Sequence, residues 1–171
     1  MVSGIPGIGK STWIQNHKDF VEGKTLVISR DEIRFSLLKD DDPYFSKEDE
    51  IWAEYINQIK AAIDNDKVDN IFLDATHINP RLRNKVFKAL GKKYLEKVNE
   101  INNIWFLCDV RLAIERNEKR AGTKRYVPTK AIYNMYATSE IPLLEEKFNN
   151  RYIVDAENGI LVKLIEERIG E

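Results

Sequence analysis

The sequence of 171 residues has one cysteine, Cys108, so no disulfide bond can form within the chain. It has no apolar run near the length of about 20 residues that a membrane-spanning helix needs. Its first residues, Met1-Val2-Ser3, show no leader pattern. The 27 Lys and Arg nearly balance the 28 Asp and Glu, so the net charge of −1 attracts no polyanion. We therefore expect a cytoplasmic protein without membrane attachment, in which any polyanion would bind to local basic clusters.

The 43% of hydrophobic residues are enough for one core, and we expect a single domain over residues 1–171. Short apolar runs alternate with longer segments of helical periodicity, which is typical of a parallel sheet with helices on both faces. We expect about five strands, at residues 1–3, 25–28, 71–73, 101–107 and 152–154. We expect helices at residues 11–20, 31–38, 47–64, 80–95, 110–119, 128–139 and 160–169. The pattern predicts an α/β fold.

The segment Gly4 to Thr12 fills every position of the phosphate-binding pattern G-x-x-x-x-G-K-[ST]. In this pattern the backbone N–H groups of the loop and the positive end of the next helix surround phosphate oxygens. We expect Lys10 to reach the β- and γ-phosphates of a nucleoside triphosphate and the Ser11 hydroxyl to bind Mg²⁺. The loop residues expected to bind ATP are Gly4, Pro6, Gly7, Ile8, Gly9, Lys10, Ser11 and Thr12.

Asp31 follows the second expected strand, at the edge of the sheet where open α/β folds bind ligands. Its carboxylate can accept the proton of a hydroxyl that attacks the γ-phosphorus. Arg34, one helical turn later, can orient Asp31 or hold an anionic substrate. An alternative stays open, in which Asp31 only caps the helix and pairs with Arg34.

The third expected strand ends at Asp74, a carboxylate expected to hold Mg²⁺ near Ser11, mainly through water. Thr76 and His77 come next at the same edge, and we expect both to contact the acceptor. Catalysis by His77 is not expected, because Asp31 already offers a base.

Arg116 and Arg120 are four residues apart, so they share one face of a helix. They precede a polar loop around Gly122. We expect residues 116–130 to form a lid whose two arginines stabilise the charge of the transferring phosphoryl group. The alternative is that both arginines pair with acidic neighbours on the surface.

Charge is locally segregated despite the neutral total. Residues 39–54 are strongly acidic, whereas residues 81–97 and 111–130 are mainly basic. Each run can be a solvated surface, and the basic runs can equally contact nucleic acid.

Four motifs occur in a defined order: G-x-P-G-x-G-K-S-T-W from Gly4, R-D-x-x-R from Arg30, D-A-T-H-x-N-P from Asp74, and E-R-N-x-K-R from Glu115 followed by V-P at Val127. This set resembles the P-loop kinase domain of phage and bacterial polynucleotide 5′-kinases over nearly the whole chain. The resemblance implies a P-loop kinase fold with a helical lid.

The resemblance also implies a function, with ATP and Mg²⁺ as cofactors and a 5′-hydroxyl end of RNA or DNA as acceptor. With this resemblance, we expect catalysis by Lys10, Asp31, Arg34 and Arg120, ATP binding also by Arg116 and Arg120, and acceptor binding by Arg30, Arg34, Thr76 and His77. His77 departs from the pattern, because many relatives have Asn there.

Two other functions stay open. A kinase of small molecules, such as a nucleoside, a sugar or an antibiotic, would use the same loop and base. A non-catalytic, toxin-like ATP-binding switch would use the loop alone. The basic run at residues 111–130 favours a polyanionic acceptor over a sugar, and Asp31 argues against a simple switch.

Overall fold

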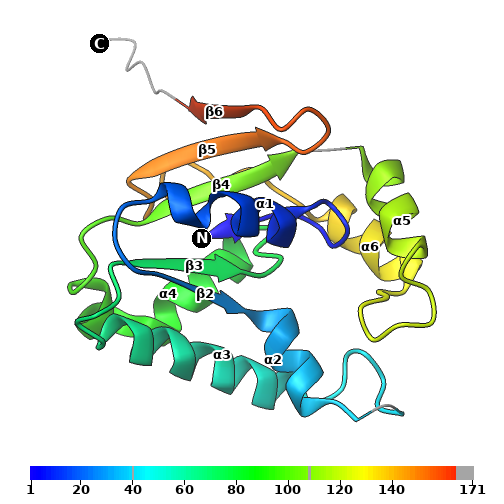
Figure 1. Cartoon of the computed structure of the whole chain (residues 1–171), viewed down its shortest axis with the longest axis horizontal. Helices are drawn as coiled ribbons and strands as arrows, with labels where there is room; N and C mark the ends of the chain where they lie inside the picture. Colours follow the sequence, from blue (N-terminus) through cyan, green and yellow to red (C-terminus); the bar gives the residue numbers. More distant parts are fainter. Residues whose placement is uncertain (40, 108, 165–171) are drawn as a thin grey trace.

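The computed structural model describes residues 1–39, 41–107 and 109–164, which build one six-stranded sheet in the order β2-β3-β1-β4-β5-β6. Figure 1 shows the strands stacked from β6 at the top to β2 at the bottom. The first five strands are parallel, and β6 is antiparallel to β5. The strands are β1 (Val2–Ser3), β2 (Thr25–Ser29), β3 (Asn70–Asp74), β4 (Asn102–Leu107), β5 (Asn150–Asp155) and β6 (Leu161–Leu164).

The helices pack into two apolar cores that the sheet separates. One core contains side chains of α1, α5 and α6, and the other contains side chains of α2, α3 and α4. The helices are α1 (Lys10–His17), which continues as a 3₁₀ turn (Lys18–Phe20), α2 (Arg30–Leu37), α3 (Glu48–Ile63), α4 (Pro80–Leu95), α5 (Val110–Glu118) and α6 (Thr129–Ala137).

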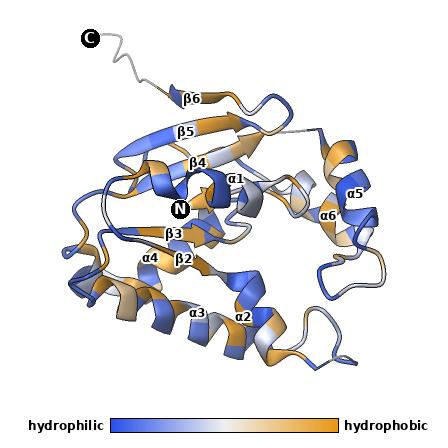
Figure 2. Ribbon diagram, in the orientation of Figure 1, coloured by the Kyte–Doolittle hydropathy of each residue, from blue (hydrophilic) through white to orange (hydrophobic). Residues whose placement is uncertain are grey.

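Strand residues alternate between these cores, as the two-residue period of a strand requires. Val2 packs with the first core and Met1 with the second, and the neighbours Val27 and Ile28 divide in the same way. Figure 2 shows the corresponding mixture of hydrophobic and hydrophilic residues along α3, which has one buried side. The predicted parallel sheet with helices on both faces is confirmed.

The helix predicted at residues 160–169 is wrong in its first part, because Leu161–Leu164 form the strand β6. A tight turn returns the chain onto β5. The Asp155 carboxylate accepts the N–H groups of Glu157 and Asn158, and Gly159 has a φ of +72° that its missing Cβ permits. Residues 165–169 and Cys108 lie outside the described part of the chain.

The sheet topology brings the glycine loop and the ends of β2 and β3 to one edge of the sheet. β1 lies between β3 and β4, so the loop after β1 leaves the sheet between two strands that are distant in sequence. The carboxyl ends of β2 and β3 adjoin it, with Ser29 paired in register with Asp74. Ligands of open parallel sheets bind at such an edge. Within the described residues, no helix has the length and apolar character needed to cross a bilayer.

Candidate active site

The glycine loop connects β1 to α1 and is shaped by close backbone contacts. Gly4 donates its N–H to the Thr76 carbonyl at 2.8 Å, which fixes the start of the loop to the end of β3. Gly7 has a φ of +81°, and a Cβ there would overlap the carbonyl oxygen of Ala113 in α5. Gly9 begins α1 in the left-handed conformation, with no side-chain cap. The first N–H groups of α1 have no partner within the helix, so this end suits a phosphate.

Two basic side chains lie against the loop. Lys10 is 8% exposed, and its Nζ donates to the carbonyls of Gly4 and Ile5 at 2.9 and 2.8 Å. Arg116 of α5 donates from Nη1 to the Ile8 carbonyl at 3.2 Å. Arg120 follows α5 and is half-buried, without a side-chain hydrogen bond or ion pair to the described residues. The structure therefore places Arg116 at the loop, and Arg120 in the segment that follows α5.

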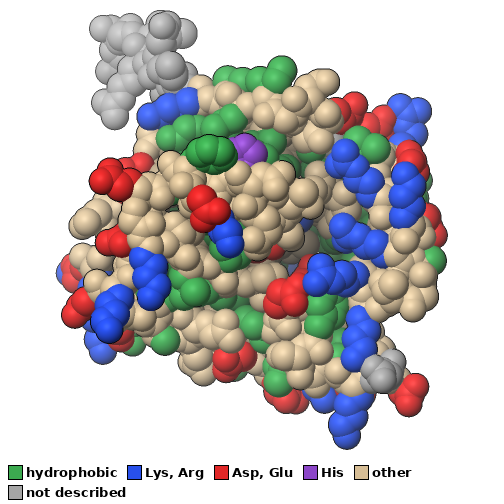
Figure 3. Space-filling view, viewed as in Figure 1, with side chains coloured by type: hydrophobic (Ala, Val, Ile, Leu, Met, Phe, Trp, Pro, Cys, Tyr) green, Lys and Arg blue, Asp and Glu red, His purple; other side chains and the backbone are tan. Residues whose placement is uncertain are grey.

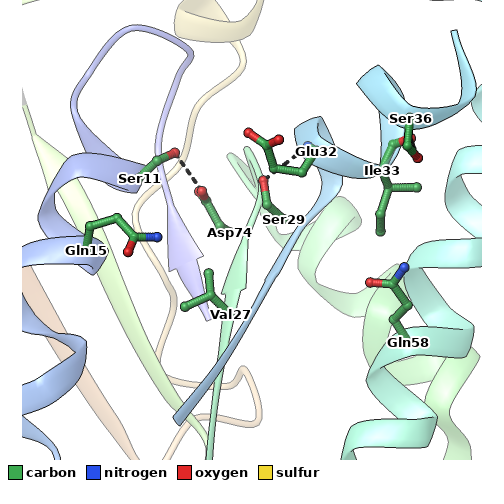
Figure 4. A pocket seen from close by; sticks show the side chains of 9 residues that line it. All are labelled: Ser11, Gln15, Val27, Ser29, Glu32, Ile33, Ser36, Gln58 and Asp74. Atoms are coloured by element: carbon green, nitrogen blue, oxygen red, sulfur yellow. Dashed lines mark hydrogen bonds between the residues drawn. The ribbon is translucent and has the colours of Figure 1, made fainter.

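Ser11 and Asp74 meet at the mouth of the loop. The Ser11 hydroxyl donates to Oδ2 of Asp74 at 2.6 Å, as the dashed line in Figure 4 shows. Burial raises the pKa of Asp74, and the nearby Lys10 charge opposes that shift. A hydroxyl and a carboxylate oxygen are hard ligands that suit Mg²⁺, which usually takes its other ligands from phosphate and water. The two residues fit the predicted metal site.

Asp31 lies in the first turn of α2 with its side chain 57% exposed. The helix cap is Ser29, whose Oγ accepts the N–H of Glu32, so the alternative that Asp31 serves only as the cap is not supported. The Asp31 carboxylate accepts hydrogen bonds from Arg34 and, at 3.2 Å, from the Tyr44 hydroxyl. Burial raises the pKa of Tyr44, which keeps this phenol a neutral donor.

Arg34 is 5% exposed and contacts Asp31, which is one of its two expected roles, and its burial gives no support to a contact with the acceptor. Its guanidinium donates to Glu48 at 2.7 Å, and Arg30 donates to the same carboxylate at 2.6 Å. Glu48 is the first residue of α3 and forms an ion pair with each of the two arginines. No sequence motif points to Glu48 or Tyr44, because only the packing of α3 and the preceding loop against α2 brings them to Asp31.

The ring of His77 is buried, which gives no support to the expected contact with the acceptor. The ring is 4% exposed, donates from Nδ1 to the Val2 carbonyl at 2.9 Å and accepts at Nε2 from the Tyr55 hydroxyl at 3.2 Å. A φ of +41° at this residue accompanies the inward position of the ring. Burial lowers the pKa of His77 to about 3, so the ring is neutral. Thr76, half-buried, supports the loop through its carbonyl.

A groove of about 360 Å³ opens beside Ser11 and Asp74. In Figure 4 the Glu32 carboxylate lies beside Ser29, on the side of the groove facing Asp74. Glu32 also pairs at 2.7 Å with Arg125, which lies between α5 and α6. In Figure 3 the surface is hollowed near the centre of the view, with basic and acidic side chains next to the hollow. No sequence motif points to Glu32, which lines the groove, or to its partner Arg125.

The sheet edge thus brings together the glycine loop, the hydrogen-bonded pair of Ser11 and Asp74, and the Asp31 carboxylate. A profile of the AAA domain family matches residues 1–142 of the chain. The chain belongs to the AAA domain family. In this AAA domain, the match includes the glycine loop, Asp31, Asp74 and the arginines of α5. A search of curated proteins found no match.

Solved structures share the fold of this AAA domain at low sequence identity. A gluconokinase from Sinorhizobium meliloti 1021 is 16% identical over 91% of this chain and 80% of that chain, with a TM-score of 0.55. Kti12 from Chaetomium thermophilum, solved with ADP-AlF3, is 15% identical over 90% of this chain and 87% of that chain, with a TM-score of 0.59. A fungal RNA kinase is 11% identical over 100% of this chain and 76% of that chain, with a TM-score of 0.56. The chain has the P-loop kinase fold.

Proposed function

We propose that this protein is a kinase that transfers the γ-phosphoryl group of ATP to the 5′-hydroxyl end of RNA or DNA. The observation that carries the proposal is the position of Asp31, which is held by Arg34 and Tyr44 at the same sheet edge as Lys10 and the pair of Ser11 and Asp74. An alcohol acceptor needs a base at this place, whereas a nucleotide-dependent switch does not.

The chain supplies positioning and charge for this transfer. Lys10 and the N-terminal N–H groups of α1 bind the β- and γ-phosphates. Ser11 and Asp74 would hold Mg²⁺, which would neutralise phosphate charge. Asp31 accepts the proton of the acceptor hydroxyl while the acceptor oxygen bonds to the γ-phosphorus and the bond to the ADP oxygen breaks. We propose that residues 116–130 act as the lid that carries Arg116 and Arg120 to the phosphates.

The ordered motifs support a polynucleotide as the acceptor. R-D-x-x-R from Arg30 places the base between two arginines, and the structure gives this motif a defined geometry around Glu48. Arg30 keeps part of its surface open, with its side chain 21% exposed. Of the expected acceptor residues, Arg30 and Thr76 therefore remain in the proposal.

A kinase of small molecules is the second candidate, and the groove beside Asp74 favours it. Gln15, Ser29, Ser36 and Gln58 line this groove with uncharged groups that form hydrogen bonds. Such a lining suits a hydroxyl-rich molecule of the size of a sugar or a nucleoside.

The test is a transfer assay with γ-labelled ATP, Mg²⁺ and a panel of acceptors. The panel contains 5′-hydroxyl RNA and DNA oligonucleotides, nucleosides, a nucleoside 3′-monophosphate and sugars including gluconate. We expect label on the 5′ end of an oligonucleotide, and loss of transfer in Lys10→Ala but not in Lys147→Ala, a change at an exposed lysine. Label only on a sugar or nucleoside would establish the second candidate. ATP binding without transfer to any acceptor would favour a switch.

A further inference from the structure

The arginines nearest the base cannot by themselves hold a polynucleotide. Arg34 is buried and pairs with both Glu48 and Asp31, and Arg30 pairs with Glu48. Each phosphate of a bound strand that loses its counterions needs a cation of the protein in its place. The cations that bind the strand behind its 5′ end must therefore come from another surface.

The outer side of α4 carries such cations. Arg81, Lys85 and Lys88 are exposed and spaced by four and three residues, so they lie on one face of the helix, before the backbone departs from helical geometry at Gly91. None of them forms an ion pair with a residue in the described part of the chain. No acidic residue occurs between Pro80 and Leu95.

Two lysines that follow Gly91 differ from these three residues, because each of them forms an ion pair. Lys92 pairs with Glu96 at 3.4 Å, and Lys97 pairs with Asp64. These two lysines have carboxylate partners, whereas Lys93, also exposed, lies beyond Gly91 with its Nζ 5.3 Å from the centre of the Tyr94 ring. Before Gly91, the exposed cations of α4 are Arg81, Lys85 and Lys88. We call these three residues the α4 basic face.

Trp52 of α3 links the α4 basic face to the site. Its ring lies 5.6 Å from the guanidinium carbon of Arg30 and 4.3 Å from Nζ of Lys85. Arg30 is the residue before Asp31, so the indole of Trp52 lies between the segment that carries Asp31 and the α4 basic face. Helices α3 and α4 are in contact, and α4 begins six residues after Asp74, near the edge that carries the site (Figure 1).

We propose that the α4 basic face binds the phosphates of the acceptor strand that follow the 5′ nucleotide, so that the strand leaves Asp31 past Trp52 and runs along α4. The proposal rests on the proposed function. Arg81 and Lys88 are seven residues apart, or about 10 Å at 1.5 Å per residue. A stacked strand has one phosphate per about 3.4 Å, so the face matches about three phosphates.

The first test measures binding without catalysis. The triple variant Arg81→Gln, Lys85→Gln, Lys88→Gln is compared with the control triple variant Lys24→Gln, Lys67→Gln, Lys147→Gln, which removes three exposed lysines elsewhere. Fluorescence anisotropy of a 3′-labelled ten-nucleotide strand is followed at several salt concentrations. Three lost contacts at about 0.7 per phosphate make the slope of log affinity against log salt shallower by about 2. The control should keep the wild-type slope, and a common slope for all three proteins would overturn the proposal.

The second test compares acceptor lengths. At low salt, the loss of kcat/KM in the α4 triple variant should be about 10- to 100-fold larger for the ten-mer than for a 5′-hydroxyl dinucleotide, which is too short to reach the face. Equal losses on both acceptors would contradict the proposal. If the wild-type protein phosphorylates neither acceptor, the proposed function fails, and the salt slopes alone decide whether α4 binds the strand. Equal melting temperatures of the three proteins confirm that each variant is folded.

Discussion

The Asp31 carboxylate is oriented by two donors that are themselves fixed. Arg34 is held by Glu48, and its guanidinium carbon lies 4.7 Å from the centre of the Tyr44 ring. Tyr44 donates its hydroxyl to the same carboxylate. A base that is held in place by packed groups and still 57% exposed can meet an acceptor at little reorganisation cost.

Replacing the base should separate binding from chemistry. Asp31→Asn keeps the shape of the side chain and removes the proton acceptor, so kcat should fall roughly 10²- to 10⁴-fold. The dissociation constant of ATP should stay within about twofold of the wild-type value. Single-turnover transfer and equilibrium ATP binding measure the two effects, with the exposed Asp19→Asn as the control. Transfer at the wild-type rate would show that Asp31 has no part in the chemistry.

Glu48 should act through the arginines that position Asp31. In Glu48→Gln the charged partner of Arg30 and Arg34 is lost, and charged hydrogen bonds of this kind contribute about 1.5–3 kcal/mol. We expect kcat to fall at least about tenfold, with little change in KM for ATP. The control is Glu54→Gln, on the same helix, where the exposed carboxylate accepts a hydrogen bond from Gln58. Equal kcat values in the two variants would mean that Glu48 has only a structural role.

Among the elements, the sequence predicted the five parallel strands, since each is a short apolar run before a helical segment. It did not predict β6, because residues 160–164 are too few to distinguish a strand from a helix by periodicity. The pair Asn158-Gly159 is a hairpin signal that could have revealed the turn. The structure shows that the predicted loop, base and metal residues share one edge, but the partners of Asp31 depend on tertiary packing, which no local pattern contains.

The packing of the glycine loop on α5 predicts that two Gly→Ala substitutions lower the free energy of unfolding by different amounts. Gly7 has a φ of +81° and meets Ala113, whereas Gly122 has a φ of +78° with no atom within 4 Å of an added Cβ. Gly122→Ala should cost about 1 kcal/mol of unfolding free energy, from backbone strain alone. Gly7→Ala should cost about 2 kcal/mol more, because the loop and α5 must separate, and it should weaken ATP binding. Urea unfolding of both variants measures the difference. An equal loss of unfolding free energy in the two variants would mean that the contact of Gly7 with Ala113 does not constrain the loop.

The segment that follows α5 predicts a second contrast, between Arg120 and its neighbour Lys119. Arg120→Ala should lower kcat by up to the order of 10³, with a much smaller change in KM for ATP, since an arginine of a closing segment acts mainly in the transition state. Lys119→Ala removes only an exposed pair with Glu115 and should retain wild-type kcat. An unchanged kcat in Arg120→Ala would leave Arg120 as a surface residue and would remove it from the lid.

At the scale of the whole molecule, His77 connects parts of the fold that are distant in sequence. Its ring joins the Val2 carbonyl in β1 to the Tyr55 hydroxyl in α3, and its own carbonyl accepts a hydrogen bond from the fully buried Arg83. Arg83 also pairs with Glu146 at 2.7 Å. These contacts fix α3, α4 and the segment before β5 around the end of β3, so the sheet edge that carries the site depends on a neutral imidazole.

This neutral imidazole should make the stability of the protein sensitive to acid. The pKa of His77 is lowered by burial from 6.5 to about 3, so between these pH values the unfolded chain binds a proton that the folded chain does not. The contribution of His77 to stability is therefore complete above pH 6.5 and is lost as the pH falls toward 3, by up to about 1.4 kcal/mol per pH unit. His77→Asn can keep a donor for the Val2 carbonyl and cannot titrate.

Urea unfolding at intervals between pH 8 and pH 4 tests this linkage. The variant should be less stable than the wild type at pH 8, since the smaller side chain leaves space in a packed site. Its unfolding free energy should then fall less steeply than that of the wild type below pH 6.5, while the two slopes coincide above that pH. Identical slopes below pH 6.5 would mean that the His77 ring takes up its proton in the folded protein. The contacts of the ring with β1 and α3 would then not require the neutral imidazole.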